Sequence, residues 1–287
     1  MKTKTAIKKR LFLFAAYDKS GVIDSSLIYY IKTLSKFGDI VFFMDSDTNA
    51  NELEKLKSYT IYADGIRHGE YDFGSYKRAY QWAKANIDTS KYDYIYLVND
   101  SVYGPLYDMD RYFRAMEGSG HDAFGLVKNP HKEHPHIQSW FVGLTQDVFS
   151  SDWFDHFIQQ VTKLANKGEI THLYEHGLSR KIVENGYTWD CLYSVPGRGI
   201  YNKVKRLYLS GVPFIKRVAF TRNHGALGGQ IKYILNHISM DASDAIKNSA
   251  ERLYGTGYIK WLLTKNPLKI IYRNIKHALH KIFIEGL

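Results

Sequence analysis

The stretch Tyr94-Ile95-Tyr96-Leu97-Val98-Asn99-Asp100-Ser101 decides the fold class of this 287-residue chain. An apolar run of strand length that stops abruptly at a polar triplet is typical of a strand buried on both faces. Two earlier runs, residues 11–16 and 40–44, have the same character. Strands of this kind are expected side by side in a parallel sheet, with their polar ends at one edge.

Segments with helical periodicity alternate with these runs. Asp24 is expected to cap a helix that ends at Gly38 and whose apolar face is made by Leu27, Ile31 and Leu34. A second helix is expected over residues 49–58, a short strand at residues 60–63 and a third helix after residue 75. This order predicts an α/β fold with a mostly parallel, Rossmann-like sheet flanked by helices. Such sheets bind ligands at the carboxyl ends of their strands.

The second half of the chain is less regular. Strands are expected over residues 123–127 and 137–144, and helices over residues 152–165 and 174–185. No repeat or low-complexity linker separates these segments. Residues 1–240 are therefore interpreted as one domain, and residues 241–287 as a helical basic tail.

The charge of the chain is concentrated in its second half. There are 39 basic and 29 acidic residues, yet residues 191–240 contain no acid and residues 260–287 contain one, Glu285. This asymmetry indicates an anionic partner: nucleic acid, a membrane surface or a phosphorylated ligand. No nucleic-acid-binding motif is present, so nucleic acid is not expected. The single cysteine, Cys191, excludes a disulfide framework and an all-cysteine metal site.

The last segment has the pattern of a basic amphipathic helix. One face carries apolar residues at three- and four-residue steps, namely Leu268, Ile271, Ile275, Leu279 and Ile282. Such a helix can lie on an anionic membrane or pack on its own domain, and both interpretations stay open. No apolar run approaches the roughly 20 residues that span a bilayer. The run at residues 11–16 is short for a signal peptide, so a cytoplasmic protein, peripheral on the inner face of the cell membrane, is expected.

Polar residues after the apolar strands are the candidates for donor binding. Asp100, between Asn99 and Ser101, can hold a divalent cation that bridges a diphosphate, or can belong to a simple turn. Tyr17 follows the first apolar run in the same way. The segment after residue 70 opens a helix whose start favours phosphate, and it supplies the candidate nucleotide-binding residues Asp72, Phe73, Gly74, Lys77 and Arg78. Alternatively, Asp72 or Ser75 is only the helix cap.

Two further segments are candidates for the acceptor side. Glu175 opens a predicted helix and can act as a general base, although an acid also simply favours a first helical turn. Gln138-Ser139-Trp140 combines an aromatic face with hydrogen-bonding side chains, which suits a sugar ring. His131, His134 and His136 match no zinc pattern and are interpreted as part of a polar loop.

Four segments taken together resemble the rhamnan synthesis protein F family of bacterial glycosyltransferases. They occur in order as Tyr71-Asp72-Phe73-Gly74-Ser75-Tyr76, Asn99-Asp100-Ser101-Val102-Tyr103-Gly104-Pro105, His136-Ile137-Gln138-Ser139-Trp140-Phe141 and Gly211-Val212-Pro213-Phe214-Ile215-Lys216. The resemblance implies a GT-A-like fold and a nucleotide-sugar donor, either a dTDP- or a UDP-sugar. It places Asp100 at the metal-binding Asp-X-Asp motif, for Mg²⁺ or Mn²⁺, with one carboxylate where two are usual. It also places Glu175 as the base of an inverting enzyme, and His224 as a late metal or phosphate ligand.

The resulting hypothesis is a glycosyltransferase of cell-wall and surface polysaccharide synthesis. It would move L-rhamnose from dTDP-rhamnose to a hydroxyl of a lipid-linked cell-surface polysaccharide. The alternative is a non-catalytic, membrane-associated binding subunit of a polysaccharide assembly complex, which the single carboxylate at Asp100 permits.

Overall fold

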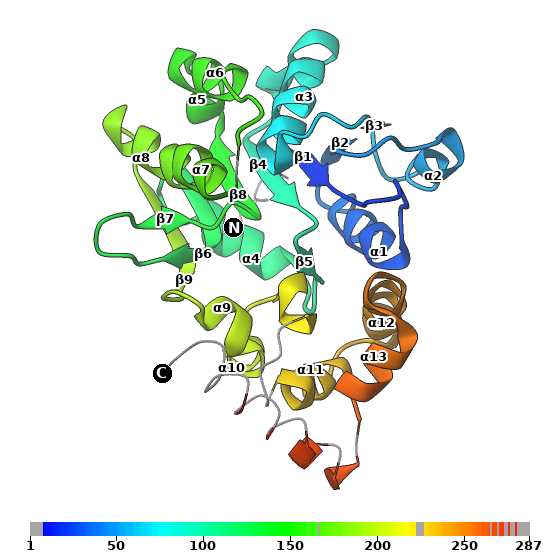
Figure 1. The fold of residues 1–287 in the computed structure, drawn as a ribbon. Coiled ribbons are helices and arrows are strands. Elements are labelled where there is room, and N and C mark those ends of the chain that lie inside the picture. Colours follow the sequence, from blue (N-terminus) through cyan, green and yellow to red (C-terminus); the bar gives the residue numbers. More distant parts are fainter. Residues whose placement is uncertain are drawn as a thin grey trace, which may run out of the picture. The chain divides into compact units, whose positions relative to one another are not determined.

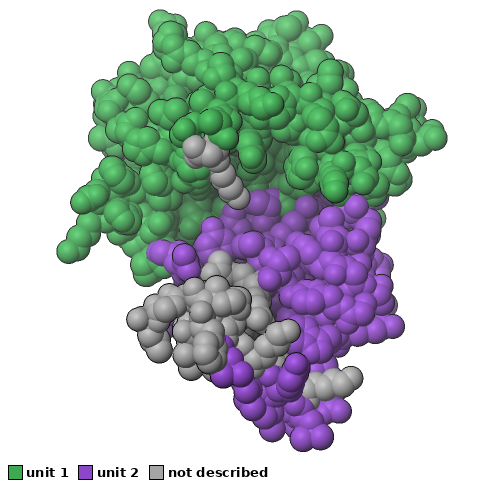
Figure 2. All heavy atoms as spheres, viewed as in Figure 1, with its two compact units in different colours: residues 1–23, 31–100, 109–196 green, residues 24–30, 101–108, 197–287 purple. Residues whose placement is uncertain are grey.

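The computed structural model describes residues 8–165, 167–221, 227–264, 266–268, 270–272, 275 and 279. Contacts divide the chain into two compact units, coloured separately in Figure 2. Unit 1 comprises residues 1–23, 31–100 and 109–196, and unit 2 comprises residues 24–30, 101–108 and 197–287. The predicted domains, residues 1–240 and 241–287, remain a prediction. Unit 2 includes residues 197–287 and therefore spans the predicted boundary.

Unit 1 is built on a sheet whose first four strands are parallel, in the order β3-β2-β1-β4. Leu13 of β1 lies between Val41 of β2 and Leu97 of β4, so the three apolar runs are neighbours, as predicted. The strands are β1 Arg10–Ala16, β2 Asp39–Met44, β3 Tyr62–Gly65 and β4 Tyr94–Asn99. The α/β fold class is confirmed.

The rest of this sheet is mixed. β8 (Phe141–Thr145) runs antiparallel to β4 and to β6 (Ala123–Asn129). β7 (His136–Ile137) and β9 (Trp189–Ser194) also pair with β6. The strand predicted over residues 137–144 is therefore split in two, because Gln138-Ser139-Trp140 interrupts it between β7 and β8.

Alternation along β1 explains how helices cover both faces of the sheet. Leu11, Leu13 and Ala15 share a core with α3 (Tyr71–Asn86), which crosses one face in Figure 1. Phe12 points to the opposite face, where it packs against Phe113 of α4 (Asp110–Glu117). Both sets of side chains are buried, which is why β1 reads as one continuous apolar run.

Several helix boundaries in unit 1 differ from the predictions. The helix expected over residues 49–58 is the shorter α2 (Ala50–Glu54), and the one expected over 152–165 is α6 (Asp152–Gln159). Gly38 does not close a helix: it lies before β2, where an added Cβ would meet the carbonyl oxygen of Arg10 at 2.2 Å. The remaining elements are η1 Thr89–Lys91, α5 Gln146–Phe149, α7 Lys167–Ile170, the π-helical turn η2 Thr171–Glu175 and α8 His176–Glu184.

Unit 2 is mainly helical and has its own apolar core. Asp24 caps α1 (Ser25–Leu34) as predicted, since Oδ1 accepts the amides of Ser26 and Leu27 at 3.1 Å each. Its Oδ2 also accepts from Ser249 at 2.6 Å and Arg252 at 2.9 Å. The other elements are β5 Val102–Tyr103 paired with β10 Ile215–Lys216, α9 Gly199–Asn202, α10 Val204–Leu209, η3 Arg217–Phe220, α11 Leu227–Leu235, α12 Met240–Tyr254 and α13 Thr256–Leu262.

None of the helices among the described residues has both the length and the apolar character that a membrane span needs.

Candidate active site

The carboxyl end of β4 brings two of the predicted donor-binding residues together. Asn99 is 1% exposed, and its Nδ2 donates to Oδ2 of Asp72 at 2.9 Å. The backbone amide of Asn99 donates to the carbonyl oxygen of Trp140 at 3.2 Å. The end of β4, the first turn of α3 and the interruption at Gln138-Ser139-Trp140 therefore meet at one edge of the sheet, where an α/β fold binds its ligands.

Asp100 lies at the same edge and is not turned toward bulk solvent. It is 6% exposed, and its amide donates to the carbonyl oxygen of Ala15 at 3.2 Å, which fixes the backbone beside the end of β1. Ser101 begins the part of unit 2 that contains β5, and its hydroxyl accepts from Nζ of Lys216 at 2.9 Å. Lys216 was not among the predicted site residues.

Glu175 is held by the interruption between β7 and β8. The amide of Ser139 donates to Oε1 of Glu175 at 3.1 Å, and the hydroxyl of Tyr76 donates to the carbonyl oxygen of Ser139 at 3.0 Å. The two peptide groups that flank the Cα of Ser139 are thus both fixed. Within the described part of the chain, Oε2 of Glu175 accepts no hydrogen bond. One oxygen orients the carboxylate and the other is available to a proton.

The turn that carries Glu175 is anchored by its neighbours. Tyr174 packs on Phe73 with ring centroids 5.5 Å apart, and its hydroxyl accepts the amide of Thr162 at 2.9 Å. Ser179, one turn into α8, accepts the amide of Ile137 at 3.0 Å. The sequence places an aromatic residue and a small hydroxyl residue on either side of Glu175, and these tie its helix to α3 and β7.

Several predicted ligand-binding residues are packed or bonded within the protein. Trp140 is 1% exposed, and its Nε1 donates to Gln138 at 2.9 Å, so neither side chain offers itself to a sugar. Phe73 lies in the core, and an added Cβ at Gly74 would meet the side chain of Glu70 at 2.3 Å. These residues stood out in the sequence because aromatic and glycine residues serve packing as well as binding.

The two cations of α3 also have protein partners. Nζ of Lys77 donates to the carbonyl oxygen of Val161 at 2.9 Å, and Arg78 forms an ion pair with Glu70 at 2.6 Å. Glu70 occupies the N-cap position of α3 without a side-chain cap bond, while Asp72 accepts from Asn99 and Ser75 is bonded to Nε2 of His68 at 3.0 Å. Burial, with the nearby charge of Arg78, lowers the pKa of His68.

Two exposed tyrosines lie beside this edge of the sheet. Tyr17 directly follows β1 and is 51% exposed, as expected for a residue that can stack on a base. Tyr71, at the start of α3, has a φ of 58°, which is unusual for any residue with a side chain. Backbone strain of this kind is often found where a site must hold a fixed shape.

Sequence reasoning missed a group of histidines next to Glu175. His134 and His136 are joined by His172 and His176, and we call these four residues the histidine cluster. The rings of His136 and His176 are 4.2 Å apart, and those of His134 and His176 are 5.7 Å apart. The available signal was the four-residue spacing of His172 and His176, which places both on one side of a helical turn.

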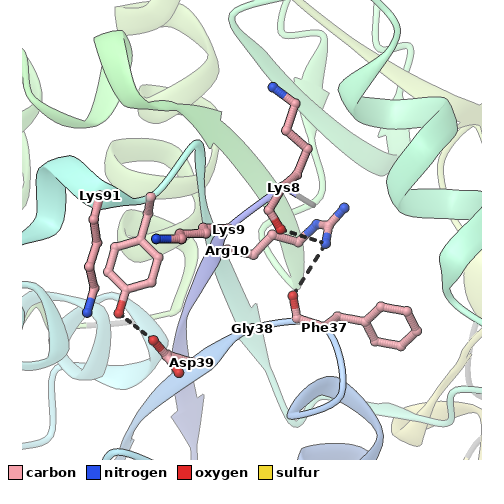
Figure 3. Close-up of a pocket in the computed structure, with 8 residues that line it drawn as sticks. Lys8, Lys9, Arg10, Phe37, Gly38, Asp39 and Lys91 are labelled. Atoms are coloured by element: carbon pink, nitrogen blue, oxygen red, sulfur yellow. Dashed lines mark hydrogen bonds between the residues drawn. The ribbon is translucent and has the colours of Figure 1, made fainter. Parts of the chain in front are cut away.

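The cavity shown in Figure 3 lies at the opposite edge of the sheet, around the amino ends of β1 and β2. Its volume is about 290 Å³, and it is lined by Lys8, Lys9, Arg10, Phe37, Gly38, Asp39, Lys91 and Tyr92. Arg10 is committed to Glu117 through two short contacts, at 2.5 and 2.8 Å. This cavity is therefore separate from the candidate active site.

A family profile described as rhamnan synthesis protein F matches residues 40–284. The chain belongs to the rhamnan synthesis protein F family. The resemblance drawn from its sequence motifs is thereby confirmed, and membership supports a role in polysaccharide synthesis by glycosyl transfer. A search of curated proteins found no match.

Three solved structures are among those similar to this family member. Core-mannan synthase A from Aspergillus fumigatus, in a Mn/GDP form, is 14% identical, with a TM-score of 0.32 over 55% of this chain and 65% of that one. The mannosyltransferase Ktr4p from S. cerevisiae, in complex with GDP, is 11% identical, with a TM-score of 0.37 over 64% and 70%. TarS residues 1–349 from S. aureus are 11% identical, with a TM-score of 0.40 over 98% and 92%. With TM-scores below 0.5 and identities this low, these likenesses carry no argument about the activity of this chain.

The described residues of this family member offer few candidate metal ligands. Among the described residues, no group of three or more His, Cys, Asp or Glu side chains is placed to hold a metal ion. His224 lies outside the described residues. Asp100, a buried acid at the end of β4, fits only the mode in which Mg²⁺ or Mn²⁺ takes one carboxylate from the protein and its other ligands from phosphate and water.

Proposed function

We propose that this protein is an inverting glycosyltransferase that moves L-rhamnose from dTDP-rhamnose to a hydroxyl of a lipid-linked cell-surface polysaccharide. The observation that carries the proposal is that one segment links two acids, Asp72 and Glu175. Trp140 receives the amide of Asn99, Asn99 binds Asp72, and Ser139 holds Glu175. A donor-binding edge and a candidate base are thus fixed by adjacent residues of the same interruption.

The donor is assigned to the side of Asp72, Asn99 and Asp100. Carboxylate and amide oxygens at the end of β4 suit the hydroxyl groups of a ribose or a sugar ring. Tyr17, exposed at the end of β1, is the surface on which the nucleobase stacks. A divalent cation bound with the donor would neutralise charge on the departing diphosphate.

The acceptor is assigned to Glu175. Its Oε2 takes the proton from the acceptor hydroxyl while that oxygen forms a bond to the anomeric carbon. The bond between this carbon and the diphosphate oxygen breaks, and the nucleoside diphosphate leaves with the electron pair. Attack opposite the leaving group inverts the configuration at the anomeric carbon.

The basic tail is proposed to hold the enzyme at the anionic inner leaflet of the cell membrane. Leu268, Ile271, Ile275 and Leu279 are at least 47% exposed, so these four positions of the predicted apolar face are not covered by the described residues; Ile282 lies outside the described residues. Apolar exposure next to a basic sequence is the combination by which helices bind anionic membranes. Lipid-linked acceptors are found at the same surface.

The test is transfer by the purified full chain. Radiolabelled dTDP-rhamnose is incubated with membrane-extracted lipid-linked glycan, and label in the lipid phase is measured. We expect time-dependent incorporation that Glu175→Gln abolishes. Binding of both substrates with neither transfer nor donor hydrolysis would instead support the non-catalytic binding subunit.

A further inference from the structure

The histidine cluster brings together two segments that are distant in sequence. His134 precedes β7 and His136 lies within it, while His172 and His176 come from η2 and the first turn of α8. The ring centroids of His134, His172 and His176 are 5.7 to 6.1 Å from one another. Glu175 lies within the second segment, so the cluster borders the candidate base.

One nitrogen of the cluster lacks the partner that a buried group normally has. Nδ1 of His136 donates to the carbonyl oxygen of His134 at 2.8 Å. Nδ1 of His176, by contrast, is buried and has no hydrogen-bond partner among the described residues. Buried polar atoms are almost always satisfied, so this nitrogen indicates a ligand that the protein itself does not supply.

No ion pair neutralises the cluster among the described residues, although the charge of Glu175 acts on His176. In the described residues, none of its four rings forms an ion pair with a carboxylate. Burial lowers the pKa of His176 to about 4, helped by the imidazoles of His136, His134 and His172 and opposed by Glu175. The other charged groups on the segments packed around it are Lys128, Lys132, Glu133, Glu169, Arg180 and Asp190. Protonation of the cluster would therefore be favoured by an incoming anion.

The geometry distinguishes an anion from a metal ion. A metal needs donor atoms that converge on one point, and no such group of three exists among the described residues. A phosphate group has several oxygens in different directions, and each accepts a hydrogen bond from a separate imidazole. A tetrahedral oxyanion therefore matches rings that are close together without sharing a centre.

We propose that the histidine cluster binds a phosphate group and takes up a proton as it does so. The site lies next to Glu175, so, resting on the proposed function, the phosphate is one carried by the acceptor near the hydroxyl that Glu175 deprotonates. The cluster would then select acceptors that bear a phosphate ester at this position.

The test is a titration of the full chain, labelled at histidine Cε1, with sodium phosphate and with glycerol 1-phosphate. The titration is monitored by NMR at a pH near the ordinary imidazole pKa of about 6.5, and chloride keeps the ionic strength constant. We expect saturable shifts of the cluster resonances, and calorimetry in two buffers of different ionisation enthalpy to show proton uptake. Small uniform shifts that follow ionic strength would overturn the proposal, as would stoichiometric capture of Zn²⁺ by the cluster without any response to phosphate.

His134→Gln/His172→Gln is the matched variant, because both side chains are exposed and their loss leaves the core intact. We expect phosphate affinity to fall by about tenfold and proton uptake to be lost. His156→Gln, an exposed histidine of α6 outside the cluster, is the control and should bind as the parent does. Equal affinity in the double variant would contradict the assignment.

Vesicles of phosphatidylglycerol distinguish the source of the phosphate. We expect them not to shift the cluster resonances when soluble glycerol phosphate does. Shifts with vesicles alone would overturn the proposal in favour of a membrane headgroup. Neither titration contains a nucleotide sugar, so a protein that binds phosphate here yet shows no glycosyl transfer would lose the proposed function and keep this site.

Discussion

Replacing Glu175 by glutamine removes the proposed base while keeping its support. The amide oxygen of glutamine accepts the Ser139 amide as Oε1 does at 3.1 Å, so the turn η2 keeps its anchor. Only the oxygen that takes the proton is lost. Loss of a general base lowers the rate by about 10²–10⁴, which corresponds to roughly 2.7 to 5.5 kcal/mol of transition-state stabilisation.

The stability of the same variant should barely change. An isosteric replacement at a half-exposed position that keeps its hydrogen bond is expected within about 0.5 kcal/mol of the parent protein. Glu175→Ala is different, since it leaves the Ser139 amide without its acceptor and costs about 1–3 kcal/mol. Comparing the two variants separates chemistry from folding.

The assay is the turnover number for rhamnose transfer, with free energies of unfolding measured in urea for the same samples. We expect Glu175→Gln to lose turnover without losing stability, and donor affinity to be unchanged. Turnover within threefold of the parent, in a protein of parental stability, would refute the role of Glu175.

Three further predictions concern other parts of the chain. Asn99→Leu removes the amide that binds Asp72 at 2.9 Å and should lower the free energy of unfolding by about 1–3 kcal/mol; a neutral result in urea would contradict the proposed edge. Burial opposes the ionisation of Asp24, but Arg217, Ser249, Arg252 and Leu27 together lower its pKa below the ordinary 3.8. Its contribution is therefore present above about pH 4 and lost as the pH falls through the depressed pKa, and Asp24→Asn should flatten that part of the stability profile measured by urea melts. A chain ending after Thr264 should no longer sediment with anionic vesicles, and full sedimentation would rule out the tail as the membrane anchor.

Three strands of unit 1, β1, β2 and β4, could be predicted because they are buried on both faces. Burial on both sides requires an uninterrupted apolar run, and residues 11–16, 40–44 and 94–98 have one. The cap at Asp24 was also predictable, because the amides that it accepts lie only two and three residues further along the chain. Local sequence contains the information for local bonds.

The contacts that depend on distant residues could not be predicted in this way. Lys77 and Trp140 are residue types that often bind ligands. In the structure, however, Lys77 donates to the carbonyl oxygen of Val161 and Trp140 is buried in the core. The interruption at Gln138-Ser139-Trp140 exists because Asn99, Tyr76 and Glu175 bind its backbone. Nothing in the segment itself marks these partners. The same holds for the histidine cluster, whose two halves are about forty residues apart in the sequence.

Calorimetric titration of dTDP-rhamnose into the full chain and into Asp100→Asn, each with and without Mn²⁺, tests most directly whether the donor is bound at the end of β4. The parent protein should bind one donor and bind it more tightly with the cation. In Asp100→Asn, the gain in donor affinity caused by the cation should be smaller by about tenfold. Identical affinities for the two proteins, with the cation and without it, would contradict the placement of the donor beside Asp100.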